Sequence, residues 1–162
     1  MQKLWCTSFL EFKKNAYKNE WDIEVPDFIA IISINNSGYN SVPEEYHVCK
    51  DSNNVLNLNF DDSDPMAYNL DDDASIYTDS FNTIKFFDND MAEKAVKFIE
   101  FNKNKDFFIH CSAGISRSQA FVKYIINTYI DKEFYTNPNN PCEFANGFVY
   151  HKLNEMYRNI NC

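Results

Sequence analysis

The strongest constraint on the fold is the segment His110–Ser118, HCSAGISRS, which lies between two apolar stretches of different character. Before it, Phe107–His110 is short and apolar, as expected for a buried strand. After it, Ser118–Ile130 is long and apolar enough to form a helix. A tight loop that joins a buried strand to a helix N-terminus turns its backbone N–H groups toward one centre, where the helix dipole adds positive potential. The sequence therefore predicts an anion-binding turn inside an α/β fold.

The rest of the chain alternates between strand-like and helix-like stretches. Strands are predicted where apolar and β-branched residues run together between turn residues. Helices are predicted where apolar residues recur at a spacing of three or four, with Asp88 or Asn89 available to cap the first of them. The predicted strands are 27–34, 46–49 and 55–60, and the predicted helices are 91–102 and 144–157. This alternation predicts the α/β class, with a central, mostly parallel β-sheet flanked by α-helices.

Length and composition predict one folded domain. The chain has 162 residues, of which 44% are hydrophobic and 17% aromatic, and this is enough to bury a single core without disulfide bonds. We therefore expect one domain over residues 1–162, with an acidic insertion at about 61–80. The longest apolar run, Phe28–Ile34, is far shorter than the roughly 20 residues that cross a membrane. We expect no secretory signal and no membrane partner.

Cysteine usage and charge exclude further classes of protein. The five cysteines are an odd number and form no CxxC pair, so we expect neither a disulfide framework nor a zinc site. A reducing cytoplasm is the expected location, or the host cytoplasm if the source is a phage or virus. The net charge of −9 argues against a nucleic-acid partner. The acidic stretch Asp61–Asp79 lacks the EF-hand pattern, so no metal is expected. The expected state is a monomer.

Within the segment, each residue type suits the binding of a tetrahedral dianion. Cys111 stands at the base of the turn, and Gly114 permits a turn or a close approach that a β-carbon would resist. Arg117 can fold back and bind two oxygens through its planar guanidinium. The same positive field favours a thiolate, since such surroundings lower a cysteine pKa from about 8.5 to roughly 3.5–7.5. Cys111 is thus predicted to be an ionised nucleophile. The predicted phosphate-binding residues are Ser112, Ala113, Gly114, Ile115, Ser116 and Arg117.

The pattern His-Cys-x-x-Gly-x-x-Arg is specific. Four fixed residues would match by chance in about one chain in a thousand of this length. The alternative interpretation is a buried, unreactive cysteine in a strand–helix turn. The predicted strand, loop and helix favour the reactive cysteine, because this is the context that the chemistry needs.

The segment HCSAGISRS resembles the HCxxGxxR(S/T) signature of the cysteine-based protein tyrosine phosphatases. The small size of the chain is similar to that of the dual-specificity branch, and the order of its elements is similar to that of small phosphatases of bacterial and phage type. The resemblance extends over about residues 27–155 and is strongest over 88–127. It implies a site at the carboxyl edge of the sheet, in agreement with the general rule for open α/β sheets.

The resemblance also implies a role for individual residues. Cys111 would attack phosphorus and form a phosphocysteine, while Arg117 and the loop amides would stabilise the phosphoryl oxygens. Ser118 would help the thiolate to leave in the second step. His110 would orient the loop and favour the thiolate. No metal or other cofactor is required.

The family also uses an aspartate as general acid, on a loop after the strand that precedes the helix. Asp62 is the first choice because it follows the predicted strand 55–60, and Asp61 is the second. The interval from Asp62 to Cys111 is longer than is usual in the family, so the acidic stretch would be an insertion after the acid. Asp79 has the more typical spacing and is the third choice.

The resulting hypothesis is a protein phosphatase that acts on phosphotyrosine, with phosphoserine and phosphothreonine as further candidate substrates. Its partner would be a phosphorylated protein. Two alternatives stay open. The same loop could act on a phosphoinositide or an RNA 5′-triphosphate, although it carries no extra lysine or histidine and the acidity of the chain disfavours polyanions. The chain could instead be a phosphate-binding module with impaired catalysis.

Overall fold

The structure is a computed structural model that describes residues 2–37, 47–129, 132–136 and 143–162. Within these residues, five parallel strands form the central sheet in the order β3-β2-β6-β1-β7. The strands are β1 (Gln2–Ser8), β2 (Ile29–Asn35), β3 (Val55–Asn59), β6 (Asp106–Cys111) and β7 (Lys132–Thr136). β6 lies in the middle, so its last residue, Cys111, is at the carboxyl edge between β1 and β2.

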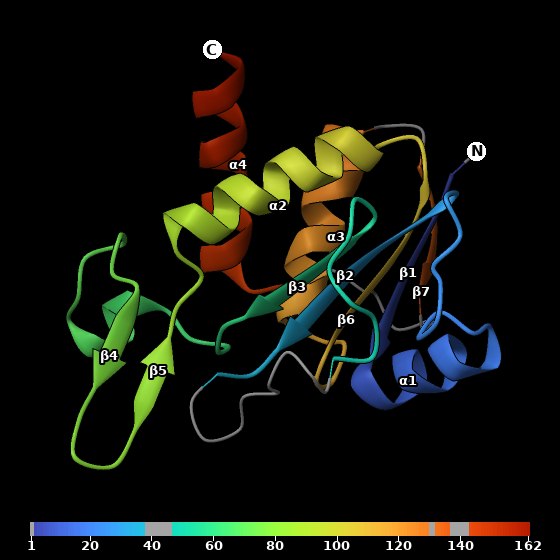
Figure 1. Cartoon of the computed structure of the whole chain (residues 1–162). Coiled ribbons are helices and arrows are strands. Elements are labelled where there is room, and N and C mark those ends of the chain that lie inside the picture. The colour runs from blue at the N-terminus through green and yellow to red at the C-terminus, as the bar shows by residue number, and fades with distance from the viewer. Residues whose placement is uncertain (1, 38–46, 130–131, 137–142) are drawn as a thin grey trace.

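Helices cover both faces of this sheet (Figure 1). One face carries α2 (Asn89–Asn102), α3 (Arg117–Thr128) and α4 (Gly147–Asn161), and the other carries α1 (Phe9–Lys18). Ile32 of β2 joins the core beneath α2, α3 and α4, whereas Ile31 shares the core of the opposite face with Phe12. Burial on both faces explains why β2 is continuously apolar rather than alternating. The predicted α/β class, a central parallel sheet flanked by helices, is confirmed. None of the described helices has a stretch long and apolar enough to cross a membrane.

Most of the predicted elements are present. The predictions at 27–34, 55–60, 91–102 and 144–157 correspond to β2, β3, α2 and α4, and the residues on either side of the signature form β6 and α3. Asp88 caps α2, as predicted, because its carboxylate accepts a hydrogen bond from the Met91 N–H at 2.9 Å. The strand predicted at 46–49 is wrong in its described part, since residues 47–50 form no strand. Tyr46 lies outside the described residues.

The sequence patterns do not predict β1, α1 or β7. β1 mixes polar and apolar residues and gives no clear run, and α1 buries only Phe12 and Ala16. A signal for α1 is present nonetheless. Ser8 and Glu11 have the spacing of a capping box, and the Ser8 hydroxyl accepts a hydrogen bond from the Glu11 N–H at 3.3 Å. This N-cap marks the end of β1 as well as the start of α1.

The acidic stretch leads into a small antiparallel hairpin outside the main sheet, formed by β4 (Ile76–Thr78) and β5 (Thr83–Lys85) (Figure 1). Lys152 of α4 holds this region in place. Its Nζ donates to the carbonyl oxygen of Asp72 at 2.7 Å and to Oδ1 of Asn89 at 2.9 Å. Only 5% of Lys152 is exposed, so one buried ammonium group connects the acidic stretch with α2 and α4.

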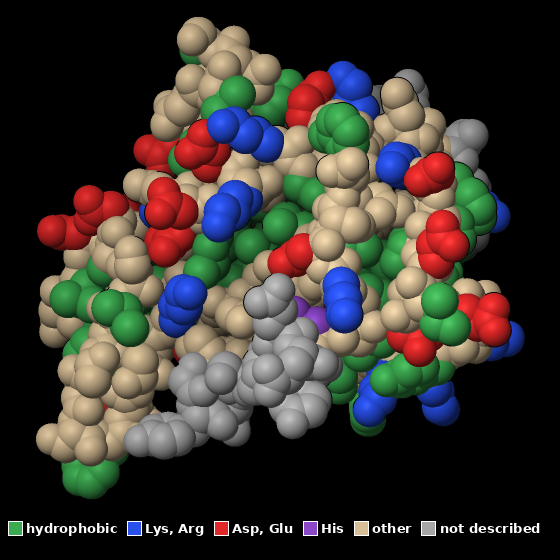
Figure 2. All heavy atoms as spheres, in the orientation of Figure 1, with side chains coloured by type: hydrophobic (Ala, Val, Ile, Leu, Met, Phe, Trp, Pro, Cys, Tyr) green, Lys and Arg blue, Asp and Glu red, His purple; other side chains and the backbone are tan. Residues whose placement is uncertain are grey.

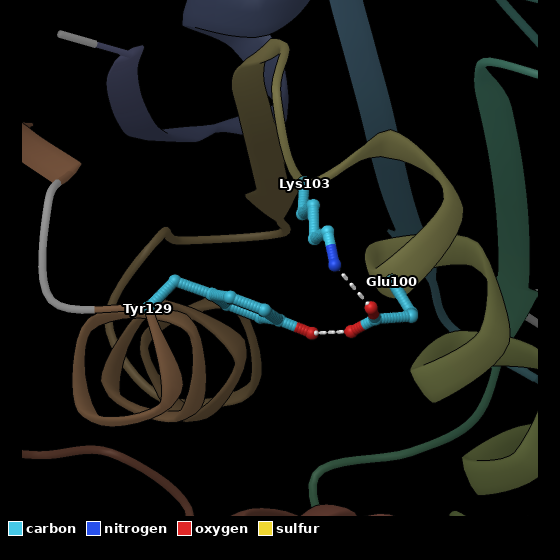
Figure 3. A network of polar contacts seen from close by, with 3 residues as sticks. All are labelled: Glu100, Lys103 and Tyr129. Carbon is cyan, nitrogen blue, oxygen red and sulfur yellow. Dashed lines mark hydrogen bonds and ion pairs between the residues drawn. The ribbon is translucent and has the colours of Figure 1, made fainter.

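A polar network joins the carboxyl ends of α2 and α3 (Figure 3). The Tyr129 hydroxyl, at the C-cap of α3, donates to Glu100 Oε2 at 2.6 Å, and Lys103 Nζ donates to Oε1 at 2.6 Å. The bond from Lys103 and then the bond from Tyr129 hold the pKa of Glu100 below its ordinary value. The network therefore stabilises the fold at neutral pH. That contribution is lost as the pH falls through the lowered pKa and the carboxylate takes up a proton.

We predict that Tyr129→Phe lowers the free energy of unfolding by about 1 kcal/mol or less at pH 7, because it removes a partly solvated hydrogen bond to a carboxylate. The cost should shrink as acid protonates Glu100, and urea unfolding at neutral and acidic pH measures it. Tyr150→Phe is the matched control, since it removes a bond between two neutral groups, Asn127 Nδ2 and the Tyr150 hydroxyl, at 2.8 Å. The same pH dependence in both variants would contradict this account of the network.

Candidate active site

The loop between β6 and α3 begins with Cys111 and ends with Arg117, and we call residues 111–117 the cysteine loop. Neighbouring elements hold its backbone. The carbonyl oxygen of Ser112 accepts a hydrogen bond from the N–H of Phe9, the first residue of α1, at 3.2 Å. The carbonyl oxygen of Gly114 accepts one from Gln119 Nε2 of α3 at 3.0 Å. Two helices on opposite faces of the sheet therefore fix the loop.

Gly114 lies where the cysteine loop touches the end of β1. Its φ of +72° is in the left-handed region that favours glycine. A β-carbon at this position would lie 2.6 Å from the carbonyl carbon of Thr7 and 2.8 Å from the backbone nitrogen of Ser8. The backbone conformation and the close approach each exclude a side chain. The sequence predicts such a role for this glycine but not its partner strand.

Cys111 is buried at the base of the loop, with 3% of its surface exposed. Its Sγ lies 3.1 Å from the Oγ of Ser118 and accepts a hydrogen bond from the N–H of Gly114 at 3.3 Å. Burial raises the pKa of the thiol, but the hydrogen bonds from Ser118, the charge of Arg117 and the bond from Gly114 together outweigh it. The pKa of Cys111 is lowered as a result, which favours the nucleophilic thiolate.

Ser118 connects two thiols. Its buried Oγ accepts a hydrogen bond from the Sγ of Cys6 on β1 at 3.2 Å and lies 3.1 Å from the Sγ of Cys111. Because Cys6 donates to this hydroxyl, the proton of Ser118 is directed toward Cys111. Cys6 has no role in the sequence analysis. It reaches the site because β1 pairs in parallel with β6.

Arg117 is the first residue of α3, and only 5% of it is exposed. Its Nη1 donates to the carbonyl oxygen of Phe60, just after β3, at 2.7 Å, and its Nη2 donates to the Oγ of Ser112 at 3.1 Å. The Ser112 hydroxyl in turn donates to Oδ1 of Asn36, just after β2, at 3.2 Å. The carboxyl ends of β2 and β3 therefore hold the guanidinium against the cysteine loop.

His110 is fully buried behind the loop. Its Nε2 lies 2.7 Å from the Oγ of Ser33 on β2, and its ring stacks on Phe12 of α1 with centroids 4.1 Å apart. Burial lowers the pKa of His110 to about 3, against the opposing effect of a hydrogen bond with the Cys111 backbone. The imidazole is therefore neutral near pH 7, and it supports the loop through packing and hydrogen bonding rather than through a positive charge.

The remaining predicted phosphate-binding residues have accessible side chains. Ala113 is exposed, Ile115 is 53% exposed and Ser116 is half-buried. None of these side chains carries a charge, so an anion at the loop would meet backbone N–H groups and Arg117.

Asp62, the first choice for the general acid, reaches the cysteine loop. Its exposed carboxylate accepts hydrogen bonds on Oδ1 from the Ser116 hydroxyl at 2.8 Å and from Nδ2 of Asn146 at 2.7 Å. Asp61 has different partners, because it accepts hydrogen bonds from the backbone N–H groups of Ser37 at 3.1 Å and Lys85 at 3.0 Å. The adjacent aspartates thus serve separate purposes, one at the loop and one between two backbone segments.

Asp79 closes the turn of the β4–β5 hairpin. Its Oδ1 accepts hydrogen bonds from the N–H groups of Phe81 at 2.8 Å and Asn82 at 2.7 Å. These bonds lower the pKa of its carboxyl group and so favour the ionised form over the form that carries a proton. In the part of the chain that the structure describes, no three His, Cys, Asp or Glu side chains lie close enough together to hold a metal ion.

Several residues at the loop are absent from the sequence analysis: Cys6, Ser33, Asn36, Phe60, Gln119 and Asn146. Asn146 carries a signal, since asparagine is a preferred N-cap. It lies two residues inside the helix predicted at 144–157, and the structure begins α4 directly after it. Cys6, Ser33 and Phe60 reach the site because of the order of the strands in the sheet, and the sequence patterns do not predict that order.

Comparison with known proteins gives a limited likeness. No family model matches the chain, and no curated protein matches it. Among solved structures, the chain is similar to the human tyrosine phosphatase-like serine/threonine/tyrosine-interacting protein, with 20% identity and a TM-score of 0.42. The match covers 83% of this chain and 79% of that chain. At this identity and TM-score the likeness assigns no function.

We predict that Gly114→Ala lowers the free energy of unfolding by about 2–5 kcal/mol, because the left-handed conformation and the overpacking against Thr7 each cost stability. Gly147→Ala is the matched control. A β-carbon at position 147 has no neighbour within 4 Å, and alanine is preferred to glycine in a helix, so this variant should be as stable as the parent or more so. Urea unfolding measures both variants. A Gly114→Ala protein of parental stability would contradict the close contact with β1.

Ser118→Ala should raise the pH at which Cys111 becomes reactive, because the thiolate loses the hydroxyl that stabilises it. The measurement is the rate of alkylation by iodoacetamide against pH, followed by mass spectrometry on the peptide that contains Cys111. The exposed Cys162 provides an internal reference whose pH dependence should not change. An unchanged midpoint at Cys111 would show that Ser118 does not stabilise the thiolate.

Proposed function

We propose that this chain is a cysteine-dependent protein phosphatase that hydrolyses phosphotyrosine, with phosphoserine and phosphothreonine as further substrates. The observation that carries the proposal is the setting of Cys111, whose buried sulfur meets donors from Ser118 and Gly114 beside a helix N-terminus. Arg117 adds a buried positive charge that pairs with no carboxylate in the described part of the chain. A stabilised thiolate next to a fixed guanidinium suits attack on a phosphate monoester.

In the first step the Cys111 thiolate attacks phosphorus. The S–P bond forms while the P–O bond to the leaving group breaks. The Arg117 guanidinium and the backbone N–H groups of the cysteine loop donate hydrogen bonds to the phosphoryl oxygens, on which negative charge develops. Asp62 gives its proton to the leaving oxygen, so that a tyrosine side chain departs as a neutral phenol.

In the second step a water molecule attacks the phosphorus of the phosphocysteine. The Asp62 carboxylate takes a proton from that water and is ready for the next turnover. The S–P bond breaks, and Cys111 leaves as a thiolate stabilised by the Ser118 hydroxyl. The products are inorganic phosphate and the starting enzyme, and the scheme uses no cofactor.

A phosphorylated protein is favoured over a polyanionic substrate. The net charge of the chain is −9, and Arg117 is the only cationic side chain of the cysteine loop. On the face shown in Figure 2, Lys and Arg side chains are interspersed with Asp and Glu and form no continuous patch. A phosphoinositide or an RNA 5′-triphosphate needs more positive charge than this loop offers.

The proposal is tested by the hydrolysis of p-nitrophenyl phosphate and of a phosphotyrosine peptide. Cys111→Ser should abolish turnover, because the alcohol is not ionised, and should retain vanadate binding, because Arg117 and the loop amides remain. Cys162→Ser, at an exposed thiol, is the matched control and should keep full activity. Turnover near the parental rate in Cys111→Ser would overturn the nucleophile. A parent protein that binds vanadate without hydrolysing either substrate would be a binding module.

Asp62→Asn should lower kcat on the phosphotyrosine peptide by about 10²–10⁴-fold, the usual contribution of a general acid to a basic leaving group. The loss on an activated aryl phosphate should be much smaller, because that group leaves without a proton. Asp61→Asn and Asp79→Asn, measured side by side, should show no such dependence on the leaving group. A steep dependence in Asp79→Asn alone would move the general acid to the hairpin.

A further inference from the structure

Asn146 uses three of its polar groups at the candidate site. Its backbone N–H donates to the carbonyl oxygen of Ser116 in the cysteine loop at 3.1 Å. Its side-chain Oδ1 accepts a hydrogen bond from the N–H of Val149 at 3.0 Å, which makes it the N-cap of α4. Its Nδ2 donates to Oδ1 of Asp62 at 2.7 Å. One residue therefore contacts the loop, the helix and the proposed general acid.

The N-cap determines which way the amide of Asn146 points. Val149 presents a backbone N–H, which only the carbonyl end of the amide can accept. The NH₂ end must then face the opposite side, where it meets Asp62. The bond from the Asn146 backbone to Ser116 fixes the main chain as well. Both the position and the orientation of this donor are thus set by the fold before any substrate binds.

Asp62 gains a fixed orientation from this arrangement. Its side chain is exposed, and an exposed carboxyl would otherwise rotate freely. Asn146 Nδ2 and the Ser116 hydroxyl both donate to the same oxygen, Oδ1. Oδ1 is therefore occupied by two donors, and a proton on the carboxyl belongs on Oδ2.

We propose that Asn146 is a positioning residue for the general acid, which holds Oδ1 of Asp62 at the cysteine loop so that Oδ2 delivers the proton to the leaving group. This inference rests on the proposed phosphatase function. The expected loss of rate without Asn146 follows from geometry, since misplacement of a catalytic group by about 1 Å can cost about 10²-fold in rate. The start of α4 thereby becomes part of the site, although α4 supplies no group that reacts.

Three single variants separate positioning from simple helix capping. Asn146→Ser keeps an N-cap, because serine caps as well as asparagine, but it removes the amide that reaches Asp62. Asn146→Ala removes both the cap and the donor. Asp88→Ala removes the cap of α2, which binds the Met91 N–H, and is the control for the loss of a cap with no link to the acid.

The readout is kcat on a phosphotyrosine peptide and on an activated aryl phosphate, together with the thermal unfolding midpoint. In Asn146→Ser, kcat should fall by about 10- to 100-fold on the peptide and by less than about twofold on the activated substrate, a difference that we call the leaving-group split. Its unfolding midpoint should be close to that of the parent. Asn146→Ala should show the same split and a lower midpoint. Asp88→Ala should show the lower midpoint without the split.

The double variant Asp62→Asn with Asn146→Ser should be no slower on the peptide than Asp62→Asn alone, because Asn146 acts through Asp62. Equal losses of Asn146→Ser on both substrates, or an additional loss in the double variant, would overturn the inference. So would a normal rate in Asn146→Ser when Asp62→Asn shows the leaving-group split, and the proposed function would then still stand. An active Cys111→Ser protein, or an Asp62→Asn protein without the split, would instead remove the chemistry on which the inference rests.

Discussion

The position of the cysteine loop depends on one backbone contact, between Gly114 and the end of β1. No side chain separates the two, so the loop lies against Thr7 and Ser8 at a distance that any β-carbon would prevent. At that distance the Gly114 N–H points to the sulfur of Cys111. In the parallel register of β1 and β6, Ser8 lies opposite Cys111. The strand pairing therefore also holds the start of the cysteine loop beside the end of β1. The remaining contacts of the loop with α1 and α3 add to a position that β1 already defines.

The electrostatic arrangement of the site follows from burial. A buried thiolate is costly unless it is hydrogen-bonded and placed near a positive charge, and Ser118, Gly114 and Arg117 meet those needs. Arg117 donates to a carbonyl oxygen and a hydroxyl rather than to a carboxylate. Its charge is therefore not cancelled and remains available to an anion. The buried neutral His110 adds shape to the loop without adding charge.

How far the sequence predicts the site depends on how local each feature is. The loop residues 107–118 are contiguous, so the pattern of the chain contains their strand, turn and helix. β2 is predicted as well, because burial on both faces leaves seven consecutive buried residues. β1 is not predicted, since its role rests on pairing with β6, which lies far along the chain. The choice between Asp61 and Asp62 has the same limit. The two residues are adjacent in the sequence, and only the folded chain shows that Asp62 bonds Ser116 of the cysteine loop whereas Asp61 bonds the backbone of Ser37 and Lys85.

β1 is the first strand in the chain, yet it lies inside the sheet between β6 and β7. β2 and β3 can pair once residue 59 has been made, whereas β1 must wait for β6 at residues 106–111. The ribosome adds about 5–20 residues per second, so roughly 5–20 s pass between the synthesis of the end of β1 and that of the end of β6. Until then the apolar face of β1 has no sheet to join, and it is open to chaperones. When Cys111 and Gly114 are first made, β6 has not yet paired with β1, so Gly114 does not lie against Thr7 and Cys6 does not meet Ser118. Cys111 therefore begins as an ordinary thiol, and its pKa falls only when the sheet closes around β1.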